Sequence, residues 1–134
     1  DRMATSAKGP EVTPVVTLAD ILRARQVVDR IYVDEKVRDY IVDIVHASRN
    51  PAEYRVDAQG LIEFGASPRA TIALTLCARA QAFLEGRGYV TPQDVKNVAL
   101  DVLRHRIIAS YEAEAEGLTS DDLVMRILDR IAVP

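Results

Sequence analysis

The sequence predicts an all-α protein, a bundle of about five helices joined by loops and a few short extended segments. Two observations lead to this prediction. Five residues of the types that cap helices each stand directly before a stretch in which apolar residues recur every three or four positions. In addition, no alternation of apolar and polar residues continues long enough to form a substantial strand.

The five expected helices begin after Thr17, Asp34, Ser67, Thr91 and Thr119. After Thr17, Thr91 and Thr119, an acidic residue follows three positions later, which is close to the spacing of a capping box. After Ser67 and Thr91, the next residue is proline. Proline suits the first helical position because the amide hydrogen that it lacks would have no intrahelical partner there.

Loops and short extended segments are expected between the helices. The second helix should end near Ser48, because Asn50-Pro51 disfavours helical conformation. The third should end at Gly86 or Gly88 in a left-handed turn. The apolar runs expected to be extended or tightly turned are Ile31–Val33, Leu61–Phe64 and Ile107–Ile108.

Each expected helix carries an apolar face. In the third helix this face includes Cys77, which we expect to be a buried, unreactive thiol. Taken helix by helix, the face positions are Leu18, Ile21, Leu22 and Val28; Val37, Tyr40, Ile41, Ile44 and Val45; Ala73, Leu76, Cys77, Ala80, Phe83 and Leu84; Val95, Val98, Ala99, Val102 and Leu103; and Leu123, Val124, Ile127, Leu128 and Ile131.

Length and composition limit the class of protein. The 134 residues suit one domain, and the formal net charge of −3 argues against a general nucleic-acid binder. One cysteine and two histidines provide neither a disulfide nor a metal-ligand cluster of the usual kind. No apolar run is long enough for a membrane span or a signal peptide, so a soluble, cytoplasmic protein is expected. Residues 1–16 are expected to be a linker and residues 17–134 the folded domain.

The sequence offers few catalytic groups. It contains no Gly-x-x-x-x-Gly-Lys-Ser/Thr phosphate loop, so we do not expect this chain alone to be an enzyme. His46 and His105 are expected to have structural, hydrogen-bonded or interfacial roles. The acidic residues Glu112, Glu114 and Glu116 are expected to form a solvated surface, with a docking site for a basic neighbour as the alternative.

The most informative segment is Gly65-Ala66-Ser67-Pro68-Arg69-Ala70. It places an arginine in the first turn of a helix, where the partial positive charge of the helix dipole makes a cation unfavourable. An anion bound at this end would reverse that effect, because exposed amide groups and a guanidinium would converge on it. A solvent-exposed arginine without a ligand is the alternative, and local chemistry alone does not separate the two.

This segment, followed by an Ala/Leu-rich helix, resembles the sensor 2 segment of the MoxR family of AAA+ ATPases. Three further stretches resemble the same family in the same order, so that the resemblance covers roughly residues 15–134. They are Gly88–Val95, Leu103–Ile107 and Ser110–Gly117, and Tyr40–Val45 with Ser48-Arg49 fits the preceding helix.

The resemblance implies a C-terminal helical lid domain whose ATPase core, with its Walker motifs, is missing from this chain. Arg69 matches the sensor 2 arginine, which contacts the γ-phosphate of bound ATP from the lid side. Gly65, Ser67 and Pro68 are assigned to shaping the turn. ATP and Mg²⁺ are therefore expected in the full-length parent, with no cofactor tightly bound to this chain alone and no metal ligands within it.

The resemblance also implies partners: the AAA+ core domain of the same polypeptide, neighbouring subunits of a hexamer, and proteins with von Willebrand factor A domains in a chaperone-type remodeller. Nucleic acid and membrane are not expected partners. Two alternatives stay open. One is a DNA-binding module that uses Lys96, Arg104, His105 and Arg106; the other is a helical protein-interaction module without a nucleotide role.

Overall fold

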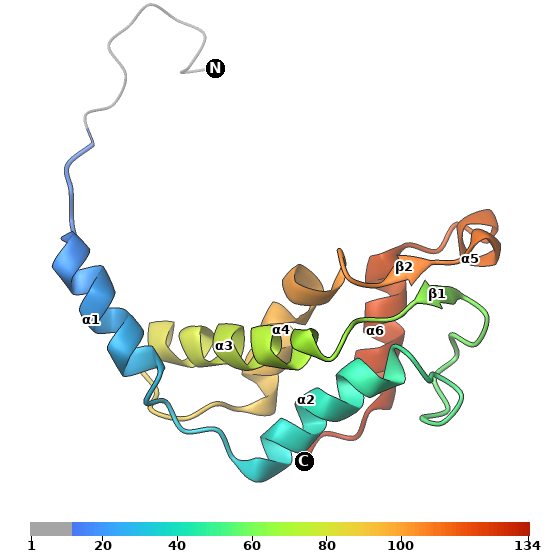
Figure 1. The fold of residues 1–134 in the computed structure, drawn as a ribbon, viewed down its shortest axis with the longest axis horizontal. Helices are drawn as coiled ribbons and strands as arrows, with labels where there is room; N and C mark the ends of the chain where they lie inside the picture. The colour runs from blue at the N-terminus through green and yellow to red at the C-terminus, as the bar shows by residue number, and fades with distance from the viewer. Residues whose placement is uncertain (1–11) are drawn as a thin grey trace, which may run out of the picture.

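The computed structural model describes residues 12–134, which form six helices and one small two-stranded sheet (Figure 1). The all-α prediction is confirmed, and the acidic segment that contains Glu112 and Glu114 forms the short helix α5. The elements are α1 (Leu18–Val28), α2 (Glu35–Ala47), β1 (Ile62–Phe64), α3 (Arg69–Leu84), α4 (Pro92–Leu103), β2 (Ile108–Ala109), α5 (Tyr111–Ala115) and α6 (Ser120–Arg130).

The expected linker lies mostly outside this description. Its residues 1–11 are outside the described residues, and residues 12–16 form neither helix nor strand. The division into a linker and a domain from residue 17 therefore stays a prediction.

Side-chain caps hold four of the five expected helix starts, and the start of α3 is the exception. Complete capping boxes form between Thr17 and Asp20, Thr91 and Asp94, and Thr119 and Asp122. In each box the threonine hydroxyl accepts a hydrogen bond from the backbone of the acidic residue, whose carboxylate accepts one from the threonine backbone. The carboxylate of Asp34 caps α2 by accepting a hydrogen bond from the amide of Lys36 (3.0 Å).

The core lies between α2, α3, α4 and α6, and α3 runs through the middle of the domain (Figure 1). The expected faces of α2, α4 and α6 are confirmed, with Val98 only partly buried. The largest fully buried side chains are Ile41, Ile44, Leu74, Leu103, Ile107, Leu123 and Ile127.

The expected face of α3 is largely wrong: of its six positions, Ala73 and Phe83 pack against the core and are only partly buried, whereas Leu76, Cys77 and Leu84 are exposed. Its buried residues are Ala70, Leu74, Ala78 and Ala82, and Cys77 is exposed instead of buried. Alanine and leucine occur all around this helix, so their spacing did not identify the inner face. Three of the four buried residues are alanines, whose small side chains allow neighbouring elements to approach α3 closely.

Helix α1 buries none of its residues, although its four expected face positions are apolar. It contacts α3, and Figure 1 shows it projecting from the body of the domain. Leu18 is 77% exposed, and Ile21 and Leu22 are each about half exposed. The apolar face of α1 is therefore not part of the core of this domain.

Short extended contacts connect distant parts of the chain. Strands β1 and β2 pair antiparallel, with Ile62 opposite Ala109 and Phe64 opposite Ile108. Elsewhere Tyr32 forms an isolated parallel bridge with Tyr89. All three expected extended segments therefore take part in β-contacts, the third through Ile108.

The connection between α3 and α4 contains a buried ion pair. The guanidinium of Arg87 donates to both carboxylate oxygens of Asp94 (2.8 and 2.5 Å) and to Glu85 (2.7 Å). Burial of Asp94 acts to raise the pKa of its carboxyl, but hydrogen bonds from Arg87 and Thr91 outweigh burial and hold that pKa below its ordinary value. The pair therefore fixes the end of α3 against the start of α4.

Candidate functional site

The turn before α3 is held against the end of α2 by a buried serine. Ser48 is fully buried, and its hydroxyl donates to the carbonyl of Val45 (2.7 Å). The same oxygen accepts a hydrogen bond from the amide of Ala66 (2.9 Å). Because Ala66 lies three residues before Arg69, this contact sets where α3 begins.

Gly65 is required at this turn by a close backbone approach. A Cβ atom at this position would lie 2.3 Å from the carbonyl oxygen of Ser48 and 2.7 Å from Cγ of Arg49. The first contact is with backbone, which cannot rotate away. The turn-shaping role expected for Gly65 therefore has a steric basis.

We expect Gly65→Ala to lower the free energy of unfolding by about 1–3 kcal/mol, because overpacking forces the turn to move. Urea denaturation of the 134-residue chain would measure the change. Gly88→Ala is the matched control, since a Cβ there meets nothing within 4 Å. Equal stability of the two variants would contradict the steric role of Gly65.

Pro68 and Ser67 shape the helix start differently from the expectation. Pro68 has helical dihedral angles (φ −54°, ψ −23°), and no side chain caps this end. The expected capping by Ser67 is therefore wrong. Its contribution is its carbonyl oxygen, which accepts a hydrogen bond from the amide of Ala70 (2.8 Å).

Arg69 is the first residue of α3, and its side chain is exposed. Within residues 12–134, its guanidinium takes part in no hydrogen bond or ion pair, and the first turn contains no acidic residue. The structure thus brings Gly65, Ser67, Pro68 and Arg69 together at one exposed helix start. This arrangement can bind an anion through the guanidinium and the positive end of the helix dipole.

The histidines differ in their surroundings. His46 belongs to a chain of polar contacts. Its Nδ1 atom lies 3.1 Å from the hydroxyl of Tyr54, and this hydroxyl donates to the carboxylate of Asp43 (2.9 Å). On the other side of the ring, Nε2 of His46 contacts the side-chain amide of Asn50 (3.0 Å). Burial and the bond to Asp43 raise the pKa of Tyr54 to about 12. The structural role expected for His46 is confirmed, whereas His105 is exposed near the end of α4.

The cations of the DNA-binding alternative are partly engaged within the domain. Arg104 pairs with Asp121 (3.2 Å), and Nε of Arg106 donates to the carbonyl of Val102 (2.8 Å). The acidic side chains of α5 and the following residue are exposed close to these cations in sequence. Both observations weaken the DNA-binding alternative.

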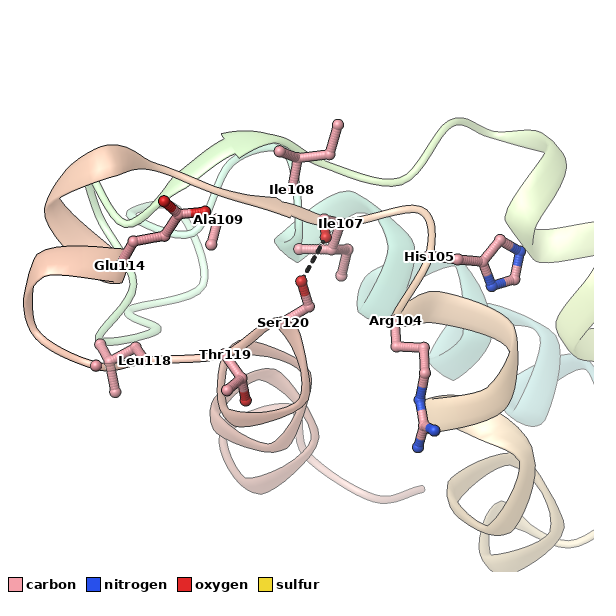
Figure 2. Close-up of a pocket in the computed structure, with 10 residues that line it drawn as sticks. Arg104, His105, Ile107, Ile108, Ala109, Glu114, Leu118, Thr119 and Ser120 are labelled. Atoms are coloured by element: carbon pink, nitrogen blue, oxygen red, sulfur yellow. Dashed lines mark hydrogen bonds between the residues drawn. The ribbon is translucent and has the colours of Figure 1, made fainter.

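A hollow of about 580 Å³ lies beside β2 and the start of α6 (Figure 2). The sequence did not indicate it. Several of its polar groups are already used: Ser120 donates to the carbonyl of Ile107 (2.9 Å), Thr119 belongs to a capping box, and Arg104 pairs with Asp121. Arg69 does not line it, so the hollow is separate from the candidate anion site.

Within residues 12–134, no group of three or more His, Cys, Asp or Glu side chains could hold a metal ion. No helix in this range has the length and apolar character needed to cross a bilayer.

Comparison with known proteins places this helix start within a family. The family described as AAA lid domain matches residues 55–127, which include β1 and the helices α3 to α5. The chain is 36% identical over 126 residues to "Chaperone MoxR1" of Mycobacterium tuberculosis, a match that covers 93% of this chain and 33% of that protein. It is 45% identical over 89 residues to "Protein MoxR" of Paracoccus denitrificans, covering 61% of this chain and 26% of that protein.

A solved structure shares the same fold. It is a candidate ATPase from Cytophaga hutchinsonii, 42% identical, with a TM-score of 0.82 over 87% of this chain and 36% of that one. The chain thus spans about a third of the length of "Chaperone MoxR1" and of this ATPase candidate. On the family match the chain belongs to the AAA lid domain family, and proteins named MoxR are among its relatives.

Proposed function

We propose that this lid contributes the sensor 2 arginine, Arg69, to an ATP-hydrolysing chaperone-type remodeller. The observation that supports the proposal is the exposed guanidinium without an internal partner in residues 12–134, held at the start of α3 by the contacts of Gly65 and Ser48. A group held in this way can contact a terminal phosphate without first breaking an internal ion pair. Its charge would stabilise the phosphoryl group during hydrolysis and couple the nucleotide state to the position of the lid.

ATP and Mg²⁺ fit this chain only in part. An arginine beside a helix start suits a phosphate oxygen, whereas the sequence has no phosphate loop to hold the rest of the nucleotide. We therefore propose that an ATP-binding core elsewhere in the same polypeptide supplies the remaining contacts and the Mg²⁺ ligands. The chain by itself would not hydrolyse ATP.

The same proposal includes the wider assembly. The lid would work in the cytoplasm, against its own core and the neighbouring subunits of a hexameric ring, with von Willebrand factor A domain proteins as partners. Support for this part comes from the family alone. The names of two relatives identify them as a chaperone and as MoxR, and the structural neighbour is an ATPase candidate.

Replacing Arg69 in the full-length protein tests the proposal. We expect Arg69→Ala to slow ATP hydrolysis at least about tenfold, because a charge-assisted hydrogen bond contributes about 1.5–3 kcal/mol. Steady-state ATPase assays would measure the rate. Arg38→Ala, which removes an exposed arginine on α2, is the control and should keep the rate of the unaltered protein. An unchanged rate and unchanged nucleotide-dependent assembly in Arg69→Ala would refute the assignment.

A further inference from the structure

One side of α3 carries a stripe of residues that the nucleotide contact alone does not explain. Arg69, Ile72, Leu76 and Arg79 recur at the spacing of a single helix face. Ile72 is 60% exposed and Leu76 is 47% exposed. The buried residues of the same helix, Ala70, Leu74, Ala78 and Ala82, lie on the other side. In the following we call Arg69, Ile72, Leu76 and Arg79 the outer stripe.

A hollow of about 280 Å³ lies on this stripe and is lined by Thr71, Ile72, Thr75, Leu76 and Arg79. The hydroxyls of both threonines are already used within the helix. Thr71 donates to the carbonyl of Pro68 (2.7 Å), and Thr75 donates to the carbonyl of Thr71 (2.8 Å). The hollow therefore combines two apolar side chains with one cationic group that is left to bind a ligand.

Arg79 has an unsatisfied hydrogen-bond donor. Its Nε atom is buried and has no hydrogen-bond partner, and its guanidinium forms no ion pair within residues 12–134. Buried donors without partners are rare in folded proteins. A partner surface that carries a carboxylate would cover Ile72 and Leu76 and pair with the charge of the Arg79 guanidinium, which has no ion-pair partner within residues 12–134.

We propose that the outer stripe is an interdomain surface and that Arg79 pairs with a carboxylate on the ATP-binding core of the same polypeptide. This inference rests on the proposed function, because it takes the orientation of the stripe from Arg69. The two arginines are about 15 Å apart along the helix axis, ten residues at about 1.5 Å each. A core that presents phosphate to Arg69 would therefore also reach Arg79.

Two observations favour the core as the occupant. The relative named "Chaperone MoxR1" is three times as long as the matched region, so its polypeptide contains a further surface of sufficient size. A second copy of the same stripe fits less well. In a two-fold contact between antiparallel stripes, Arg69 of one copy would face Arg79 of the other, and like charges repel.

Hydroxyl-radical footprinting read by mass spectrometry would test the surface. In the full-length protein, Ile72 and Leu76 should oxidise about threefold more slowly than in the 134-residue chain, because the packed centre of a contact excludes solvent. Equal oxidation in both proteins would overturn the inference. Protection that appears only as protein concentration rises would also overturn it, since the occupant would then be a neighbouring copy.

Variants of Arg79 test the ion pair. Arg79→Gln should return the oxidation of Ile72 and Leu76 toward the level of the 134-residue chain, whereas Arg79→Lys, which keeps the charge, should preserve protection. Arg38→Gln serves as the control and should change neither. Thermal melting of Arg79→Gln should match that of the unaltered protein, which separates lost docking from misfolding. Full protection in Arg79→Gln would exclude the ion pair.

The two proposals can fail separately. Slow hydrolysis in Arg69→Ala together with accessible Ile72 and Leu76 would remove the interdomain surface and leave the phosphate contact. Normal hydrolysis in Arg69→Ala together with protected Ile72 and Leu76 would remove the phosphate contact and leave a docking surface without a sensor.

Discussion

Arg87→Ala is expected to lower the free energy of unfolding by about 3–5 kcal/mol at pH 7, because it leaves a buried carboxylate without its cation. The side chain of Asp94 is 1% exposed, and that of Arg87 is 23% exposed. Thr91 still donates to Asp94 from its amide and its hydroxyl, so the lower end of this range is expected. Urea denaturation followed by circular dichroism would measure the loss.

The effect should depend on pH in a defined direction. Because Arg87 and Thr91 hold the pKa of Asp94 below its ordinary value of 3.8, the ionised carboxylate stabilises the fold above that value. This stabilisation is lost as the pH falls through the lower pKa of the folded state. Without Arg87, burial dominates and the pKa of Asp94 rises, so the stability difference between the variant and the unaltered protein should narrow between pH 7 and pH 3.

Arg104→Ala is the matched control, because its partners Asp101 and Asp121 are far more exposed than Asp94. Exposed pairs contribute roughly 0–1 kcal/mol, so this variant should unfold almost like the unaltered protein. If Arg87→Ala lost no more stability than Arg104→Ala, the buried pair would not be what fixes α3 against α4.

The sequence predicted those helices whose start and face are both encoded locally. Thr91 with Asp94 and Thr119 with Asp122 fix two helix starts through contacts three residues apart, which any local pattern can reveal. In α6 the apolar residues occupy one side, while Asp121, Arg126 and Arg130 occupy positions that the pattern assigns to solvent. The inner face was therefore unambiguous.

Contacts between distant residues were not predictable in this way. Gly86-Arg87-Gly88 indicated a helix end, and Gly86 does adopt a positive φ of 71°. Nothing in that tripeptide indicated that Arg87 would pair with Asp94, because the pairing depends on how α4 returns along α3. A turn-shaping role was expected for Gly65. Its cause, however, is the nearby carbonyl of Ser48, which lies seventeen residues earlier in the sequence.

The candidate site was predictable because an arginine in the first turn of a helix opposes the helix dipole. That local conflict singled out Arg69, and the structure leaves its charge exposed. Ser67 does not cap α3 as expected, because Pro68 already has helical dihedral angles and no side chain caps this end. No such local conflict marks Arg79 in the sequence. Its place on the exposed side of α3, ten residues after Arg69, follows only when the buried side of the helix is known.

A comparison of Leu74→Ala with Leu76→Ala tests which side of α3 is buried. The two residues lie on nearly opposite sides of a helix with about 3.6 residues per turn. Leu74 is fully buried, whereas Leu76 is 47% exposed. Leu74→Ala should lower the free energy of unfolding by about 2–5 kcal/mol through lost burial and a residual cavity.

Leu76→Ala removes the same atoms from the outer stripe and should cost the 134-residue chain no more than about 0.5–1 kcal/mol. Urea denaturation of both variants measures the contrast directly. If Leu76→Ala lowered the free energy of unfolding more than Leu74→Ala, the face expected from residue spacing would be the buried one, and the outer stripe would belong to the core. With the expected order, Leu76 is free to contact another surface, and its variant should weaken docking in the full-length protein while the lid stays folded.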